Sequence, residues 1–159
     1  MSDEQSTRQY LTFTLDEEQY AAEVARVREV LELMQVTRLP RMPEYMKGVI
    51  NIRGSVVPVV DLRQKFGMSE VAETVDTSII VMDVGRGEEQ MTVGCLADSV
   101  EEVIDIAPES VEPAPSFGTK VETEFIDGIA KRDDAFIIIL DINRVFADGE
   151  LKSLETAHA

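Results

Sequence analysis

The sequence contains almost none of the residues that usually carry catalysis. Its 159 residues include one histidine, one cysteine and no tryptophan. The histidine, His158, is the penultimate residue of a polar tail, where it can anchor neither a catalytic triad nor a metal site. The cysteine, Cys95, lies in an apolar strand pattern without a histidine to activate it, so we expect a small buried hydrophobic residue. One cysteine also excludes an internal disulfide and is typical of a reducing compartment.

Basic residues are scarce too. Fifteen lysines and arginines stand against thirty-one acidic residues, which gives a formal net charge of −16. Nucleic acid and anionic membrane surfaces repel such a chain. The longest apolar run, residues 135–140, is far too short to cross a bilayer, and the first ten residues lack the pattern of a signal peptide. We therefore expect a cytoplasmic protein that neither binds nucleic acid nor inserts into a membrane.

Motifs for nucleotides, cofactors and metals are absent from the sequence. No Walker, dinucleotide-binding, EF-hand or zinc spacing occurs. The segment Gly85-Arg86-Gly87 is short, and two glutamates follow it at once, so it predicts a hairpin turn rather than a phosphate cradle. We expect neither a cofactor nor a bound metal.

Two carboxylate patterns remain as candidates for an enzyme. Asp61 and Asp141 each precede an apolar residue that opens a short helix, which favours helix capping for both. Asp76-Thr77-Ser78 is similar to the Asp-Thr-Gly loop of aspartic proteases, whose two carboxylates share one proton. No matching loop occurs in the other half of the chain, and a serine replaces the glycine of that loop. We predict that the protein is not an enzyme.

The chain carries an internal repeat. At an offset of eighty positions, Gly48 falls on Gly128, Asp61 on Asp141, and the apolar positions between them match. Earlier in each copy, residues 27–33 resemble residues 100–106 at an offset of seventy-three. A fixed period of this size indicates two similar modules. Because a single module of about 70 residues buries little surface, we expect the two to pack against each other.

Alternation and turn residues predict a mainly β protein. Val24, Val27 and Leu31 recur at helical spacing, however, and predict a short helix beginning near Val24. Many short strands with frequent turns are typical of small β-barrels, and the duplication makes two of them. Strands are expected at residues 11–15, around Tyr20, 78–84 and 90–96, and hairpins at 48–60 and 128–140, which turn at Arg53-Gly54 and Asp133-Asp134.

Arg53 is the first candidate for a binding residue. It occupies a predicted hairpin tip, where its side chain must project into solvent. The matching tip of the second copy carries Asp133 and Asp134, so the two tips present opposite charge, and Arg53 could set the register of an acidic partner. A soluble turn residue explains the same position equally well. Val27 and Val100 likewise fit either the core or a groove between the barrels.

Five segments of the chain point to one known family: Phe13-Thr14-Leu15, Val27-Arg28-Glu29-Val30, Val36-Thr37-Arg38-Leu39-Pro40, Asn51-Ile52-Arg53-Gly54 and Pro58-Val59-Val60-Asp61-Leu62. The most specific part is the Asn-hydrophobic-Arg-Gly hairpin followed by the Pro-hydrophobic-hydrophobic-Asp-Leu strand. With these segments, the sequence resembles the CheW family of bacterial chemotaxis coupling proteins, from about residue 10 to residue 146.

This resemblance implies two SH3-like five-stranded β-barrels, related by internal duplication, with a few short helices. It implies one domain at 10–147, built from barrel subdomains at 16–75 and 76–147 that share the first strand, 10–15, with polar tails at 1–9 and 148–159. The implied function is an adaptor that couples methyl-accepting chemoreceptors to the regulatory domain of the histidine kinase CheA. Head-to-tail contacts between such double barrels can build arrays beneath the membrane.

The resemblance also implies two sets of binding residues. The receptor-binding set is Val27, Glu29, Arg53, Gly94, Val100 and Val103. The kinase-binding set is Val36, Thr37 and Gly48. Two alternatives stay open: a double-barrel scaffold of another two-component pathway, and an aspartic-type hydrolase.

Overall fold

The structure is a computed structural model that describes residues 7–68, 73–85, 88, 90–113 and 123–146. His158, the Arg86-Gly87 turn and the tails at 1–6 and 147–159 lie outside these ranges. The described part is mainly β, as predicted. Its elements are β1 (Arg8–Leu15), β2 (Glu18–Glu23), β3 (Val27–Glu32), β4 (Met46–Ile52), β5 (Ser55–Asp61), α1 (Leu62–Lys65), β6 (Ser78–Val84), β7 (Met91–Ala97), β8 (Ser99–Ile106), β9 (Val111–Glu112), β10 (Ile126–Arg132), β11 (Ala135–Leu140) and α2 (Ile142–Val145), with 3-10 turns at Val24–Arg26, Pro108–Ser110 and Thr123–Phe125.

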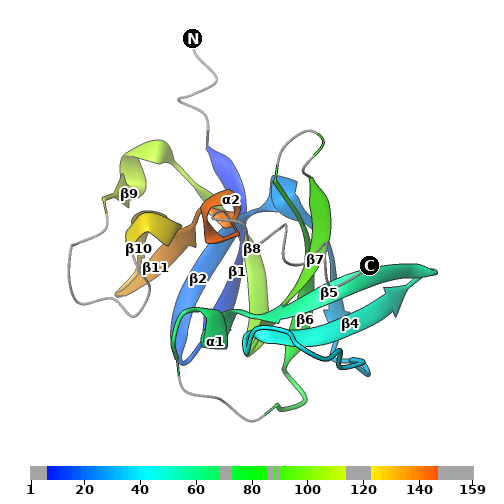
Figure 1. The fold of residues 1–159 in the computed structure, drawn as a ribbon. Coiled ribbons are helices and arrows are strands. Elements are labelled where there is room, and N and C mark those ends of the chain that lie inside the picture. Colours follow the sequence, from blue (N-terminus) through cyan, green and yellow to red (C-terminus); the bar gives the residue numbers. More distant parts are fainter. Residues whose placement is uncertain (1–6, 69–72, 86–87, 89, 114–122, 147–159) are drawn as a thin grey trace.

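The strands form two sheets, which confirms the predicted pair of barrels (Figure 1). The first barrel has five strands in the order β3-β6-β7-β5-β4, and the second has six in the order β8-β1-β2-β11-β10-β9. The sixth strand of the second barrel, β9, is only two residues long. Five strands were predicted for each barrel, so the second differs by this short edge strand.

The predicted subdomain boundaries, 16–75 and 76–147, are wrong. Strand β2 belongs to the second barrel, whereas β6 and β7 belong to the first. Parallel pairing decides this, because β5 pairs with β7 and β11 pairs with β2. Each sequence copy therefore donates its first hairpin to the barrel formed by the rest of the other copy. Strands β1 and β2 do not bridge the barrels as a shared strand; both lie within the second sheet.

The internal repeat holds in detail at the offset of eighty. Strand β4 has a register shift between Met46 and Gly48, and β10 has the matching shift between Ile126 and Gly128. Both predicted helix caps are present. The Asp61 carboxylate accepts a hydrogen bond from the backbone N–H of Arg63 at 3.0 Å, and Asp141 accepts from the N–H of Arg144 at 3.2 Å.

Three hydrophobic clusters make up the core of the described part of the chain. One fills the first barrel and draws side chains from all five strands, including Ile50, Val59 and Leu96. A second fills the second barrel around Ile137 and Ile139. The third lies between the barrels and joins residues of both sheets. Because this shared cluster has more buried members than either interior, the barrels pack as one unit, as expected from the size of each copy.

The helix predicted from Val24 is wrong. A single 3-10 turn covers Val24–Arg26, and β3 follows directly from Val27. Burial alternates along β3, with Val27, Glu29 and Leu31 more buried than the residues between them. This alternation has the period of a strand, and pairing with β6 completes it. The helical spacing of the valines and leucine was accidental.

Tyr20 gives a first prediction about stability. Its ring is buried, and its hydroxyl has no hydrogen-bond partner among the described residues. Burial raises the pKa of this phenol, since the charged form is disfavoured. Replacing Tyr20 with phenylalanine removes an unsatisfied polar group at almost constant shape. We expect the free energy of unfolding to rise by about 1 kcal/mol in urea denaturation. A decrease would show that the hydroxyl is satisfied in solution.

Candidate functional site

A groove of about 610 Å³ lies at the end of the first barrel. It is lined by β3 and the β4–β5 hairpin, together with Val81 in the middle of β6 and the first two residues of β7. Its lining combines charged and polar side chains with apolar ones. The lining residues are Arg28, Glu29, Ile52, Arg53, Ser55, Val56, Val57, Val81, Met91 and Thr92.

An ion pair between Glu29 and Arg53 spans this groove. Arg53 and Gly54 both have positive φ, at 50° and 88°, which forms the tight turn expected between β4 and β5. The turn projects the Arg53 side chain into solvent, as predicted, and leaves it 73% exposed. Its guanidinium donates to the carboxylate of Glu29 on β3. This hydrogen bond lowers the pKa of Glu29 and raises the pKa of Arg53.

The second barrel repeats this arrangement, which the sequence alone did not reveal. A groove of about 360 Å³ lies between β8 and β10. Arg132, beside the β10–β11 turn, pairs with Glu102 on β8 at 2.9 Å. Glu102 falls on Glu29 at the offset of seventy-three, so the repeat itself was the available signal. Because Arg132 stands one position before the counterpart of Arg53, the repeat did not identify it.

Exposed apolar side chains also recur in both barrels. Val56 lies beside the first groove and is 57% exposed, and its counterpart Phe136 in the second barrel is 61% exposed. Val30 and its counterpart Val103 are 42% and 51% exposed. Exposed apolar residues mark contact surfaces when they form a contiguous patch. Each barrel therefore presents an ion pair between its hairpin and a neighbouring strand, together with two exposed apolar side chains.

The predicted receptor-binding residues do not form one cluster. Glu29 and Arg53 lie together in the first groove, whereas Val103 lies in the second. Val27 and Val100 are partly buried and pack against the cluster between the barrels. They therefore lie at the junction between the barrels, where each side chain is partly buried against the shared cluster and partly exposed.

Gly94 is a closely packed residue within the first barrel. It is buried in β7, between Val59 of β5 and Val81 of β6. A Cβ atom added there would come within 2.8 Å of Cγ2 of Ile79. The residue thus keeps β7 close to its neighbours, and Val81 in turn lines the first groove.

The three predicted kinase-binding residues lie side by side at the edge of β4. Thr37 forms an isolated bridge with Val49, with two backbone hydrogen bonds of 2.8 Å. A Cβ atom at Gly48 would lie 2.1 Å from the carbonyl oxygen of Thr37 and 3.0 Å from Cγ1 of Val36. Gly48 therefore allows the segment containing Val36 and Thr37 to approach β4. The three residues form one continuous edge.

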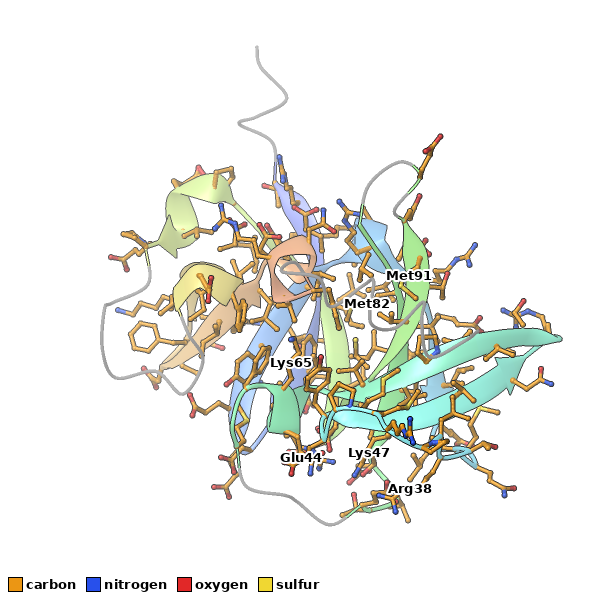
Figure 2. The ribbon with its side chains drawn as sticks, viewed as in Figure 1. Arg38, Glu44, Lys47, Lys65, Met82 and Met91 are labelled. Carbon is orange, nitrogen blue, oxygen red and sulfur yellow. The ribbon has the colours of Figure 1, made fainter. Side chains whose placement is uncertain are left out.

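Charge is distributed unequally between the two copies. Residues 27–68 contain seven basic and four acidic residues, whereas residues 100–146 contain four basic and eleven acidic residues. In Figure 2, Arg38 and Lys47 lie on the same side of the first barrel, with Glu44 close to Lys47. The β3–α1 segment thus carries a net positive charge within an acidic protein, although Arg63 is buried and Arg53 is paired with Glu29. Its exposed basic residues, Arg38 among them, favour an acidic partner.

The described residues do not support the hydrolase alternative. Both oxygens of the Asp61 carboxylate are bonded to Arg63, and Asp61 and Asp141 act as helix caps. Burial raises the pKa of Cys95 to about 12, which leaves its thiol protonated at neutral pH. In the ranges that the structure covers, no group of three or more His, Cys, Asp or Glu side chains could hold a metal ion.

Comparisons with known proteins agree on one family. The family model described as a CheW-like domain matches residues 9–150. The chain is 33% identical over 144 residues to the chemotaxis protein CheW of Klebsiella aerogenes, which covers 91% of this chain and 84% of that protein. It is 31% identical over 146 residues to a probable chemotaxis protein CheW of Rhizobium etli, which covers 92% of each.

A solved structure supports the same assignment. The scaffolding protein TtCheW of Thermoanaerobacter tengcongensis superposes with a TM-score of 0.81 and 34% identity, over 91% of each chain. Among the described residues of the present chain, no helix is long and apolar enough to cross a membrane. Sequence, fold and repeat lead to one conclusion: the chain belongs to the CheW family of chemotaxis scaffolding proteins.

Proposed function

We propose that this protein is an adaptor that couples methyl-accepting chemoreceptors to the regulatory domain of the histidine kinase CheA, at the cytoplasmic face of the membrane. It does so by binding alone, without a chemical step or a cofactor. The exposed Glu29–Arg53 pair in a groove lined by both polar and apolar side chains carries this proposal, because such a mixed surface suits macromolecular docking. Membership of the CheW family supports it.

The proposed receptor surface begins at the first groove and continues to the barrel junction. An α-helical receptor tip would lay an apolar strip against Val27 and Val100, the partly buried residues at the junction. Arg53 and Glu29 would set its register, and Val103 would extend the contact onto the second barrel. Gly94 would contribute through the packing of β7. A contact of about 800 Å² on each partner is sufficient when many weak contacts act together in an array.

The proposed kinase surface is the edge formed by Val36, Thr37 and Gly48. Arg38 and Lys47 are the sequence neighbours of Thr37 and Gly48, and together with Glu44 they place charged side chains beside this edge. We expect binding of a CheA regulatory domain to weaken as salt concentration rises, because exposed charges are screened. Light scattering of the mixed proteins measures this association directly. No association at low salt would contradict the proposed kinase partner.

Arg53→Glu tests the receptor surface. We expect a nearly unchanged melting temperature, because the Glu29–Arg53 pair is exposed and such pairs contribute little to stability. We expect at least about a tenfold loss of binding in co-sedimentation with receptor–kinase assemblies, since truncating or reversing a contact charge typically costs more than about 1.4 kcal/mol. Thermal unfolding and co-sedimentation are measured on the same preparation.

A charge swap provides the control for that experiment. Glu29→Arg combined with Arg53→Glu restores the internal pair but reverses the charges that a partner meets. If Arg53 contacts the receptor, the swapped variant stays defective. Normal co-sedimentation of Arg53→Glu, or full recovery in the swapped variant, would show that Arg53 serves only its internal pair.

A further inference from the structure

Each exchanged hairpin is held by a polar side chain across the boundary between the barrels. The β6–β7 hairpin belongs to the first barrel, and Gly85 follows the last residue of β6. Its backbone N–H donates to Oδ1 of Asn143 at 2.9 Å. Asn143 lies in α2, which follows the last strand of the second barrel. We call this contact the neutral latch.

The β1–β2 hairpin of the second barrel is held in a related way. The backbone N–H of Asp16, directly after β1, donates to Oδ2 of Asp98 at 2.7 Å. The N–H of Asp98 donates to the carbonyl oxygen of Thr14 at 2.9 Å. Oδ1 of Asp98 accepts from Nη1 of Arg63 at 2.7 Å, and Arg63 lies in α1 of the first barrel. We call this relay the charged latch.

The internal repeat relates the two latches. Arg63 and Asn143 occupy the same position of the repeat, at the offset of eighty, in α1 and α2. In both cases, the helix of one barrel holds the turn end of a hairpin that belongs to the other. The neutral latch does so through one amide, whereas the charged latch does so through a buried arginine and an aspartate. Both contacts thus connect a helix of one barrel to a hairpin of the other, one through a neutral amide and one through a charged pair.

Asp98 occupies the place where the chain crosses between barrels. It is the only residue between β7, in the first barrel, and β8, in the second. Arg63 is 1% exposed, and a buried cation requires close, well-oriented partners. The Arg63–Asp98 pair therefore restrains the crossover itself, whereas the apolar cluster between the barrels is non-directional and restrains the angle less.

We propose that these two latches fix the angle between the barrels, with Arg63, Asp98 and Asn143 as positioning residues for docking surfaces that draw on both barrels. The claim about docking surfaces rests on the proposed adaptor function, because the proposed receptor surface extends from Arg53 to Val103. The claim about the angle between the barrels concerns this protein alone. Removing a latch changes the spread or the mean of the inter-barrel distance without touching a contact residue.

The test measures a distance between spin labels on the two barrels of the full chain. Ser55 and Ala135 are exposed, equivalent positions at the first residues of β5 and β11, so each is replaced by cysteine and labelled. The native Cys95 is buried with a raised pKa and does not compete for the label. Pulsed electron paramagnetic resonance gives the distance distribution. We expect Asp98→Ala and Asn143→Ala each to shift or widen it.

A matched control separates the latches from general effects of mutation. Arg144→Ala breaks an exposed ion pair with Asp141 in the same helix as Asn143 and should leave the distribution unchanged. Circular dichroism confirms that each variant is folded. If Asp98→Ala does not fold, the test rests on Asn143→Ala alone. That variant is expected to fold, because removing the Asn143 amide leaves no buried charge without a partner. An unchanged distribution in the folded latch variants would overturn the proposal.

Co-sedimentation with receptor–kinase assemblies then tests the link to function. We expect the latch variants to bind less than the parent although Glu29 and Arg53 are intact. If the inter-barrel distance changes but binding stays normal, the latches do fix the angle between the barrels, and the claim that docking draws on both barrels is rejected. Unmoved distances with lost binding would reject the latches and leave the proposed adaptor function in place.

Discussion

Replacing Arg63 with methionine is expected to lower the free energy of unfolding by about 3–5 kcal/mol, because it leaves the buried carboxylate of Asp61 and the partly buried one of Asp98 without their cation. The Arg63 side chain is 1% exposed and the Asp61 side chain is fully buried. Nε and Nη2 of Arg63 donate to the two carboxylate oxygens of Asp61 at 2.9 and 3.0 Å. Methionine fills much of the volume but compensates neither Asp61 nor Asp98. Urea denaturation followed by circular dichroism measures the loss.

Two further variants identify the cause. Arg144→Met removes an exposed arginine that pairs with Asp141 at 3.5 Å, and we expect a change below about 1 kcal/mol. Adding Asp61→Asn to Arg63→Met removes the uncompensated charge while keeping an oxygen to cap α1. The double variant should therefore be more stable than Arg63→Met alone. Stability of Arg63→Met within about 1 kcal/mol of the parent would contradict the buried network.

Gly48→Ala is expected to destabilise the protein by roughly 2–6 kcal/mol. About 1–3 kcal/mol comes from the backbone, because Gly48 has a φ of 142°, which side chains rarely adopt. Another 1–3 kcal/mol, roughly, comes from overpacking, because the new Cβ atom would lie 2.1 Å from the Thr37 carbonyl oxygen. Backbone atoms cannot move aside cheaply, so the bridge between Thr37 and Val49 would be lost.

Other glycines separate these two terms. Gly54 has a φ of 88°, and a Cβ atom added there would meet no atom of the described residues within 4 Å, so Gly54→Ala tests strain without a clash. We expect about 1 kcal/mol there. At Gly128 the nearest atom, at 2.3 Å, is a side-chain methyl of Val111, which can partly yield. Equal losses at Gly48 and Gly54 would show that the close approach to Thr37 contributes nothing.

The Gly48 prediction also bears on the proposed kinase surface. Because Gly48 is buried, a loss of kinase binding in Gly48→Ala reports the displacement of the segment that carries Val36 and Thr37. A substitution at the exposed Thr37 side chain is the cleaner test of contact. Thr37→Glu keeps the backbone bridge and adds a charge that repels an acidic partner, so it should weaken binding while leaving the melting temperature close to that of the parent.

Local patterns were sufficient for the hairpins, turns and helix caps. The Arg53-Gly54 turn, the caps at Asp61 and Asp141 and the buried Cys95 were all predicted, because each depends on residues within a few positions along the chain. The strand at Val27 was not, since its alternation is weak and only pairing with β6 makes it regular. The exposed position of Arg53 followed from its turn, but its pairing with Glu29 required two strands to meet.

The residue order alone thus decided the fold class, the family and the number of modules, because alternation, turn chemistry and a repeat are encoded in short range. Tertiary structure decided which hairpin joins which barrel. The first hairpins of the two copies, β1–β2 and β6–β7, have similar apolar patterns. By composition alone, each hairpin could therefore complete the sheet of its own copy or that of the other. Parallel pairing of β5 with β7 and of β11 with β2 selects the exchanged arrangement. That selection depends on contacts between residues far apart in the chain, which no local pattern reports.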